Sequence, residues 1–365
     1  MRSSSVVPLV SSLVCAVLVL APVRAQKVAW PHAASHYFTG GIEAKGGPLR
    51  LQMALSFVGD PGPRRAVGEY RYDCKDLPIH VEGSYDAERG ELTLDEFSPW
   101  SRDGEKTRTG RFVGKAKPGC LEVAGGWQPA KGDKELPFAL QLVAVERSAE
   151  VRQPLAYEWA EGSVEFLDDS VLTRAARESQ RREVRERLDG GPVASRRAVG
   201  EWLDASLAAK REPEPTQISG GHRLAVHFAS PSCVSLGGRV YEFSGGAHPN
   251  HGLTCTNLLL RDGAVLPVKL ADLSTGQGAA AKLHRLVCDE LRRLGASQVG
   301  GQDEAPRDFD PDAVFLMSPG GIVFGFAPYE VGSYAEGSYF VHLSWQQLRG
   351  VLVPPPELGV ADGDR

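Results

Sequence analysis

The chain has 365 residues, long enough for two domains, and 41 lysines and arginines against 46 aspartates and glutamates give a formal net charge of −5. Basic and acidic side chains are interspersed and no basic patch carries aromatic residues, so the composition does not support a nucleic-acid partner. After the first 25 residues no stretch is apolar enough to cross a membrane, and we expect no span in the mature chain.

Residues 1–25 have the features of a secretory signal peptide. Arg2 supplies a short positive start, an apolar run extends from Val6 to Leu20, and Ala25 is a small residue that suits signal peptidase. The sequence therefore predicts cleavage near Ala25 and a secreted or periplasmic mature protein.

Five cysteines follow this segment, and in an oxidising compartment most of them are expected to form pairs. Cys74 and Cys120 are the two in the first half, so they are the natural pair if the halves fold separately. Cys233 with Cys255 is the next candidate. Cys288 lies in a helical pattern and is interpreted as a buried free thiol, although the pairing of these last three stays open.

Residues 26–150 have the pattern of an all-β domain. Short runs of alternating apolar and polar residues are separated by glycine, proline or aspartate, and glycines within the runs suit a curved sheet. Eight strands in simple order are what a small up-and-down barrel requires. The predicted strands are His36–Ala44, Leu49–Phe57, Ala66–Tyr72, Pro78–Tyr85, Glu91–Phe97, Thr107–Gly114, Leu121–Trp127 and Leu136–Val145.

Several of these strands contain Gly-x-Tyr or Gly-Trp, such as Gly68-Glu69-Tyr70 and Gly126-Trp127. In this respect the first half resembles avidin-type β-barrels. No ligand-specific motif accompanies the resemblance, so it implies no binding residues. Aromatic side chains are expected to line the barrel core, namely Tyr70, Tyr72, Phe112 and Trp127.

Residues 151–353 are expected to form an α+β domain, in which helices pack on a mostly antiparallel sheet. A linker or entry strand at 151–166 leads to a charged helix from Val171 to Asp189, preceded by the capping residues Asp168, Asp169 and Ser170. A second helix is predicted around residues 199–207. The predicted strands are Leu224–Phe228, Val240–Phe243, Leu253–Leu260, Val265–Val268, Ala313–Met317, Gly321–Phe326 and Ser338–Leu343.

A third helix is predicted after the capping pair Ser274 and Thr275, with one apolar side. Beyond the last strand, residues 354–365 are rich in proline and then acidic, and they are expected to form a disordered tail. The apolar side of the helix consists of Leu283, Leu286, Val287, Leu291 and Leu294.

Two loop motifs in the second half combine glycines, a proline and polar groups between apolar strands, a pattern typical of rigid loops. The first is Ser244-Gly245-Gly246-Ala247-His248-Pro249-Asn250, and the second is Pro328-Tyr329-Glu330-Val331-Gly332. Their order, with Leu266–Leu273 between them, resembles a bacterial extracytoplasmic domain found in the lysozyme-sensing anti-sigma factor and in some membrane-anchored peptidoglycan deacetylases. That family is mostly described as a domain of unknown function.

The resemblance extends over roughly residues 160 to 350. It implies a domain without catalytic residues of its own and, by analogy with the sensor, recognition of lysozyme. The chain differs from the sensor because it lacks a sigma-binding segment and a transmembrane helix and carries the β-barrel-like half instead. Signalling through a membrane is therefore not expected.

Three patterns suggest chemistry, and none of them is complete. His248 and His251 are spaced like a pair of metal ligands, but no nearby side chain completes a set. Ser244 has no strand–Ser–helix elbow around it. The acidic run at 304–312 lacks the glycine and terminal glutamate of a calcium loop. We therefore predict no metal and no cofactor, and interpret His248 as a loop residue whose imidazole hydrogen-bonds backbone groups around Gly245 and Gly246.

The sequence thus favours a non-enzymatic binding protein that recognises an envelope or extracellular protein or a glycan. The candidate partners are lysozyme for the protein and peptidoglycan for the glycan. Two alternatives stay open: a cell-wall hydrolase with an unrecognised active site, and a small ligand held in the first-half barrel. The candidate binding residues are those of the two loops, namely Gly245, Gly246, His248, Pro249, Asn250, Pro328, Tyr329 and Glu330.

Overall fold

A computed structural model describes residues 35–59, 63–73, 75–97, 106–117, 121–132, 134–153, 157–190, 218–243, 247–299 and 314–360. Several predictions lie outside these ranges. They are the signal peptide, the Cys74–Cys120 disulfide, the second helix at 199–207, the acidic run at 304–312, and the loop residues Gly245 and Gly246.

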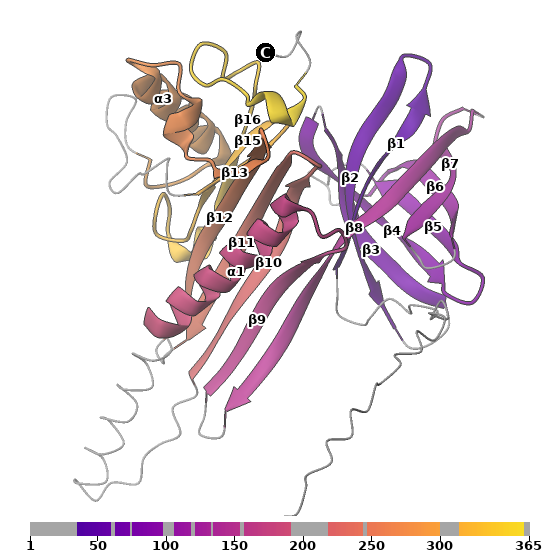
Figure 1. Cartoon of the computed structure of the whole chain (residues 1–365), viewed down its shortest axis with the longest axis horizontal. Helices are drawn as coiled ribbons and strands as arrows, with labels where there is room; N and C mark the ends of the chain where they lie inside the picture. The colour runs from indigo at the N-terminus through magenta and orange to yellow at the C-terminus, as the bar shows by residue number, and fades with distance from the viewer. Residues whose placement is uncertain are drawn as a thin grey trace, which may run out of the picture.

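Eight antiparallel strands form a closed barrel in the first half (Figure 1). Each strand pairs with the next, and β1 also pairs with β8, so every barrel strand has two neighbours. The predicted barrel and all eight of its strands are confirmed. The strands are β1 (Ser35–Ala44), β2 (Gly47–Val58), β3 (Pro63–Tyr72), β4 (Lys75–Asp86), β5 (Glu91–Phe97), β6 (Arg108–Ala116), β7 (Glu122–Pro129) and β8 (Leu136–Gln153).

The barrel interior is filled by side chains. Tyr70 and Phe112 are fully buried, and Tyr72 and Trp127 pack against them, as predicted. Glu96 is buried beside these rings, and its carboxylate accepts hydrogen bonds from the Tyr70 hydroxyl at 2.8 Å and from Trp127 Nε1 at 3.0 Å. A carboxyl group in such a place needs hydrogen-bond partners, because it has lost its water. These rings and the carboxylate occupy the barrel core.

Strand β8 is long because it continues out of the barrel. Its residues Ala144–Gln153 pair with β9 (Tyr157–Phe166), which pairs in parallel with β10. One continuous sheet of thirteen strands results, and the boundary expected at residue 150 falls inside β8. From β10 onward, neighbouring strands of this outer sheet pair antiparallel, and these strands are β10 (Ile218–Ala229), β11 (Cys233–Phe243), β12 (Asn250–Arg261) and β13 (Ala264–Pro267).

Helix α1 (Val171–Gly190) lies across the outer sheet (Figure 1). Ser170 begins it as predicted, because its hydroxyl accepts the backbone N–H of Thr173 at 3.2 Å. Leu172 and Ala176 face the sheet and join a core that also contains barrel residue Tyr37. Among the described helices, none is both long and apolar enough to span a bilayer.

A second, three-stranded sheet carries helix α3 (Ala279–Leu294). Leu283, Val287 and Leu291 of the helix are buried in one core with the sheet, as the apolar periodicity predicted, whereas Leu294 is exposed. The predicted capping pair was wrong: the helix begins after Gly278, and Thr275 Oγ1 instead donates to backbone oxygen atoms at 350–351. The strands are β14 (Phe315–Ser318), β15 (Gly321–Phe326) and β16 (Tyr339–Ser344).

Two buried polar side chains connect the sheets. Asn257 on β12 donates from Nδ2 to the carbonyl oxygen of Phe315 at 2.8 Å, and its Oδ1 accepts the Ser235 hydroxyl at 2.7 Å. The backbone N–H of Met317 donates to the same hydroxyl oxygen at 3.1 Å. The outer sheet thereby satisfies backbone groups of β14 on the neighbouring sheet.

The C-terminal segment requires a correction. Residues 354–360, expected to be part of a disordered tail, contain the short 3-10 helix η3 (Pro356–Leu358), and Leu358 and Val360 are buried. Glu357 anchors the segment through an ion pair with Arg261 at 2.6 Å. The prolines indicated a chain without a helix or strand, but they also restrict the backbone, which lowers the entropy lost on packing.

The cysteines of the outer sheet also require a correction. The register of β11 and β12 places Cys233 opposite Leu259 and Cys255 opposite Gly237. The two cysteines are therefore about 13 Å apart along the strands, at roughly 3.3 Å per residue, which is too far for a disulfide. The predicted Cys233–Cys255 pair is absent. Cys288 is a buried free thiol on α3.

Candidate functional site

The two predicted loops meet at one surface. His248 comes just before β12, and Tyr329 lies in the turn after β15, yet the Tyr329 hydroxyl is 2.9 Å from His248 Nε2. His248 Nδ1 is 3.1 Å from the carbonyl oxygen of Pro249, which can only accept a hydrogen bond. The network therefore places a proton on Nδ1, and Nε2 and the tyrosine hydroxyl share the second hydrogen bond.

A third ring completes this contact. Tyr334, in the 3-10 helix η2 (Tyr334–Glu336), stacks on His248 with ring centroids 3.8 Å apart and planes inclined by 16°. Its hydroxyl is 3.0 Å from Nε2 of His251. We call His248, His251, Tyr329 and Tyr334 the ring cluster. Tyr241 lies next to it, because it pairs with His251 across β11 and β12 and is also exposed.

The turn that carries Tyr329 is strained. Glu330 N–H donates to the carbonyl oxygen of Ala327 at 3.2 Å, Pro328 is the second residue of the turn, and Tyr329 is the third, with φ +75°. These features define a type II β-turn, which normally has glycine in the third position. A side chain in this conformation costs about 1–2 kcal/mol. The Tyr329 residue in this turn is 55% exposed.

Carboxylates fix both supports of the ring cluster. Glu330 accepts the N–H of Ala327 at 3.0 Å and so closes the turn, and burial raises the pKa of this carboxyl. Glu336 accepts hydrogen bonds from Ser297 Oγ at 2.6 Å and Ser333 Oγ at 2.7 Å, which hold its pKa well below its usual range. Glu336 is thus charged, and it anchors the 3-10 helix that presents Tyr334.

The remaining predicted residues have minor places in this arrangement. Pro249 contributes the backbone oxygen that lies 3.1 Å from His248 Nδ1, whereas the predicted backbone partners of His248 around Gly245 and Gly246 lie outside the described residues. Asn250 is exposed at the start of β12, and His251 is exposed. Sequence reasoning missed Tyr334 and Glu336. The available signal was their position, directly after the second motif.

The ring cluster offers flat aromatic faces, hydroxyl groups and imidazole nitrogens. His248 has its nitrogens on a carbonyl oxygen and on a phenol, which is not the nucleophile–base–carboxylate arrangement of a hydrolase. Within the described ranges, no three His, Cys, Asp or Glu side chains converge to hold a metal ion. Rings with a polar edge are typical of recognition surfaces.

The barrel and the α+β half place the chain among mixed α and β proteins. Residues 274–346 match a family described as "Protein of unknown function (DUF3298)", so a DUF3298 domain lies there; it includes Tyr329 and Tyr334. No curated protein matches the chain.

Two solved structures from the same family are similar to part of the chain. A member from Bacteroides fragilis NCTC 9343 has 16% identity and a TM-score of 0.47, over 60% of this chain and 97% of that one. A member from Pseudomonas aeruginosa PAO1 has 15% identity and a TM-score of 0.36, over 59% of this chain and 95% of that one.

Proposed function

We propose that this chain is a secreted or periplasmic binding protein that recognises an envelope or extracellular protein through the ring cluster. The observation that carries the proposal is the exposed Tyr329 ring, held in a strained turn against His248 from a loop about eighty residues away. Tyrosine is enriched at binding hot spots. The turn and the hydrogen bonds hold the rings in one arrangement before a partner binds, which lowers the entropy lost on binding.

Lysozyme is the specific protein partner that we propose. The order of the two loop motifs resembles that of the lysozyme-sensing domain, and the signal segment supports an extracellular location. Loss of Arg2 and Arg24 with that segment leaves the mature chain more acidic than the formal −5 of the full chain, which favours a basic partner.

Calorimetric titration of the chain with a c-type lysozyme tests this proposal. Tyr329→Ala removes the most exposed ring and is expected to weaken binding about tenfold or more, since truncation of a hot-spot residue costs about 2 kcal/mol or more. The matched control is Val113→Ala, because Val113 is 52% exposed on the barrel wall, far from the ring cluster in sequence, and is not expected to change binding.

Tyr329→Gly separates recognition from folding. It removes the same ring but relieves the positive φ, so its free energy of unfolding should exceed that of Tyr329→Ala by about 1 kcal/mol, while both variants lose binding. Absence of binding by the parent chain at micromolar concentration, or unchanged binding by both variants, contradicts the proposal. Turnover of peptidoglycan that disappears in His248→Ala contradicts a purely binding role.

A further inference from the structure

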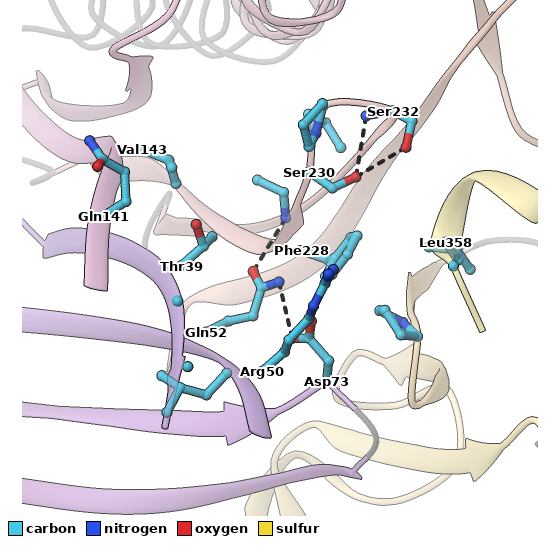
Figure 2. A pocket seen from close by; sticks show the side chains of 18 of the residues that line it. Thr39, Arg50, Gln52, Asp73, Gln141, Val143, Phe228, Ser230, Ser232 and Leu358 are labelled. Carbon is cyan, nitrogen blue, oxygen red and sulfur yellow. Dashed lines mark hydrogen bonds between the residues drawn. The ribbon is translucent and has the colours of Figure 1, made fainter. Parts of the chain in front are cut away.

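A second surface feature lies between the barrel and the rest of the molecule. It is an open cleft of about 1490 Å³ (Figure 2). One wall consists of the outer faces of β1, β2 and β8, and the other is formed by the β10–β11 turn and residues 356–360. The volume exceeds the roughly 300–1,000 Å³ of sites for drug-sized ligands, so the cleft suits an extended ligand.

The barrel wall of this cleft presents three polar side chains on neighbouring strands. Thr39, Arg50 and Gln141 make no side-chain hydrogen bond or ion pair with the described residues. They are close neighbours, because Thr39 pairs with Gln141 across β1 and β8 and Arg50 pairs with Gly41 across β2 and β1. The wall therefore offers a row of free donors and acceptors.

Side chains that are held by hydrogen bonds lie around Thr39, Arg50 and Gln141. Gln52 is buried, and it donates to Asp73 Oδ1 at 3.2 Å while its Oε1 accepts the backbone N–H of Ala229 at 3.4 Å (Figure 2). On the facing wall, the Ser232 hydroxyl donates to the carbonyl oxygen of Glu357 at 2.9 Å. Both walls are thus held in place without the ligand.

The charges of the cleft exclude a polyanion. Arg50 is the one basic residue among the described residues that line it, whereas Glu43, Asp73 and Asp168 are acidic. A fourth acid, Glu357, already pairs with Arg261. A nucleic acid or a phosphorylated ligand would meet more negative than positive charge here.

The backbone excludes a peptide added as a strand. β1 and β2 each have two strand neighbours in the barrel, and β10 and β11 each have two in the outer sheet, so these walls have no free edge for main-chain pairing. A lipid chain is also a poor fit, because the cleft is open and polar and charged side chains lie among its apolar ones. The apolar part of the lining includes three exposed leucines, namely Leu49, Leu121 and Leu167.

We propose that this cleft binds an uncharged oligosaccharide. Sugar hydroxyls both donate and accept, so they can bond Arg50 and Gln141 as donors and Thr39 and Asp73 as acceptors. The apolar C–H faces of the sugar rings pack against the leucines, and Gly41 and Ala139 leave room on the barrel wall. The site does not depend on the ring cluster: Val234 of β11 lines the cleft, while Tyr241 at the other end of that strand lies beside the cluster.

The test is a titration of the full chain with neutral linear tetra- and hexasaccharides of glucose and of N-acetylglucosamine. At least one is expected to bind. Ala139→Trp fills the cleft from an exposed position and should abolish this binding, whereas Val113→Trp, at an exposed position elsewhere on the barrel wall, should not change it. Gln141→Ala removes one hydrogen-bonding group and should weaken binding about three- to tenfold.

Three results would overturn the proposal: no binding of any of these sugars at millimolar concentration, undiminished binding by Ala139→Trp, or binding of carboxylated or sulfated analogues only. Tyr329→Ala distinguishes the cleft from the ring cluster as the place where the sugar binds. The variant should bind the sugar as tightly as the parent chain does. If it does not, the sugar binds at the ring cluster instead of the cleft.

Discussion

Glu146 lies where the barrel and the outer sheet join, and its carboxyl group has a shifted pKa. It lies on β8 at the point where the strand leaves the barrel, and its Oε1 accepts the backbone N–H of Val226 at 2.8 Å, within a bulge of β10. Burial raises the pKa of this carboxyl to about 7, and the Val226 hydrogen bond and the charges of Arg223 and Arg71 only partly oppose the effect.

This raised pKa predicts a stability that falls as pH rises. The folded chain holds the Glu146 proton more tightly than the unfolded chain, whose glutamate pKa is about 4.3, so the contribution is fully present below that value and is lost as pH rises through about 7. Glu146→Gln keeps the acceptor but cannot ionise. Urea unfolding at pH 5 and pH 8 should show that the parent loses up to about 3 kcal/mol more than the variant.

A parent and a Glu146→Gln variant with the same change between pH 5 and pH 8 would contradict this prediction. The comparison of the two chains removes the contribution of every other carboxylate, because only one residue differs.

For single residues, sequence reasoning located part of the site. Tyr329, Glu330 and His248 were selected because glycine and proline around them indicated rigid loops, and a rigid loop is a local property. That Tyr329 contacts His248 depends on how β12 and β15 pack, and no local pattern reports it. Tyr334 and Glu336 were missed for the same reason, since their roles come from contacts with His248 and with Ser297.

Among the elements, β12 and β14 depend on a side-chain bridge rather than on strand pairing. Asn257→Ala leaves the Phe315 carbonyl oxygen and the Ser235 hydroxyl without their partner inside the protein. A buried polar group without a partner costs about 1–3 kcal/mol, so the variant should lose about 2–4 kcal/mol in a urea-unfolding measurement. Asn250→Ala, at an exposed position on the same strand, should change the value by less than about 0.5 kcal/mol. Equal losses for both variants would show that the bridge is not stabilising.

Strands were easier to predict than helix starts and tails. In β2, the buried residues Leu51, Met53, Leu55 and Phe57 alternate with outward residues, and this period of two is visible in the sequence. The start of α3 was misplaced because Ser274 and Thr275 resemble a cap, although they bond residues 350–352. Residues 354–360 are held by other long-range contacts, of Glu357 with Arg261 and with Ser232, which a local pattern does not contain.

For the whole molecule, we predict that the two halves unfold together. Strand β8 belongs to the barrel and to the outer sheet, and Tyr37 of the barrel is buried in the core beneath α1. Melting of one half would therefore remove strand partners and buried surface from the other. Calorimetry should give one transition, with equal calorimetric and van't Hoff enthalpies. Two resolved transitions would show that the halves are independent.

The closure of the barrel has a consequence for the newly made chain. β1 finds its second neighbour in β8 residues 138–146, which are made roughly a hundred residues later. At about 5–20 residues per second, synthesis of that stretch takes roughly 5–20 s. During this interval β1 exposes a row of unpaired backbone groups to other chains. Until residues 138–146 are available, β1 is therefore an open edge at which the incomplete barrel is expected to pair with other chains.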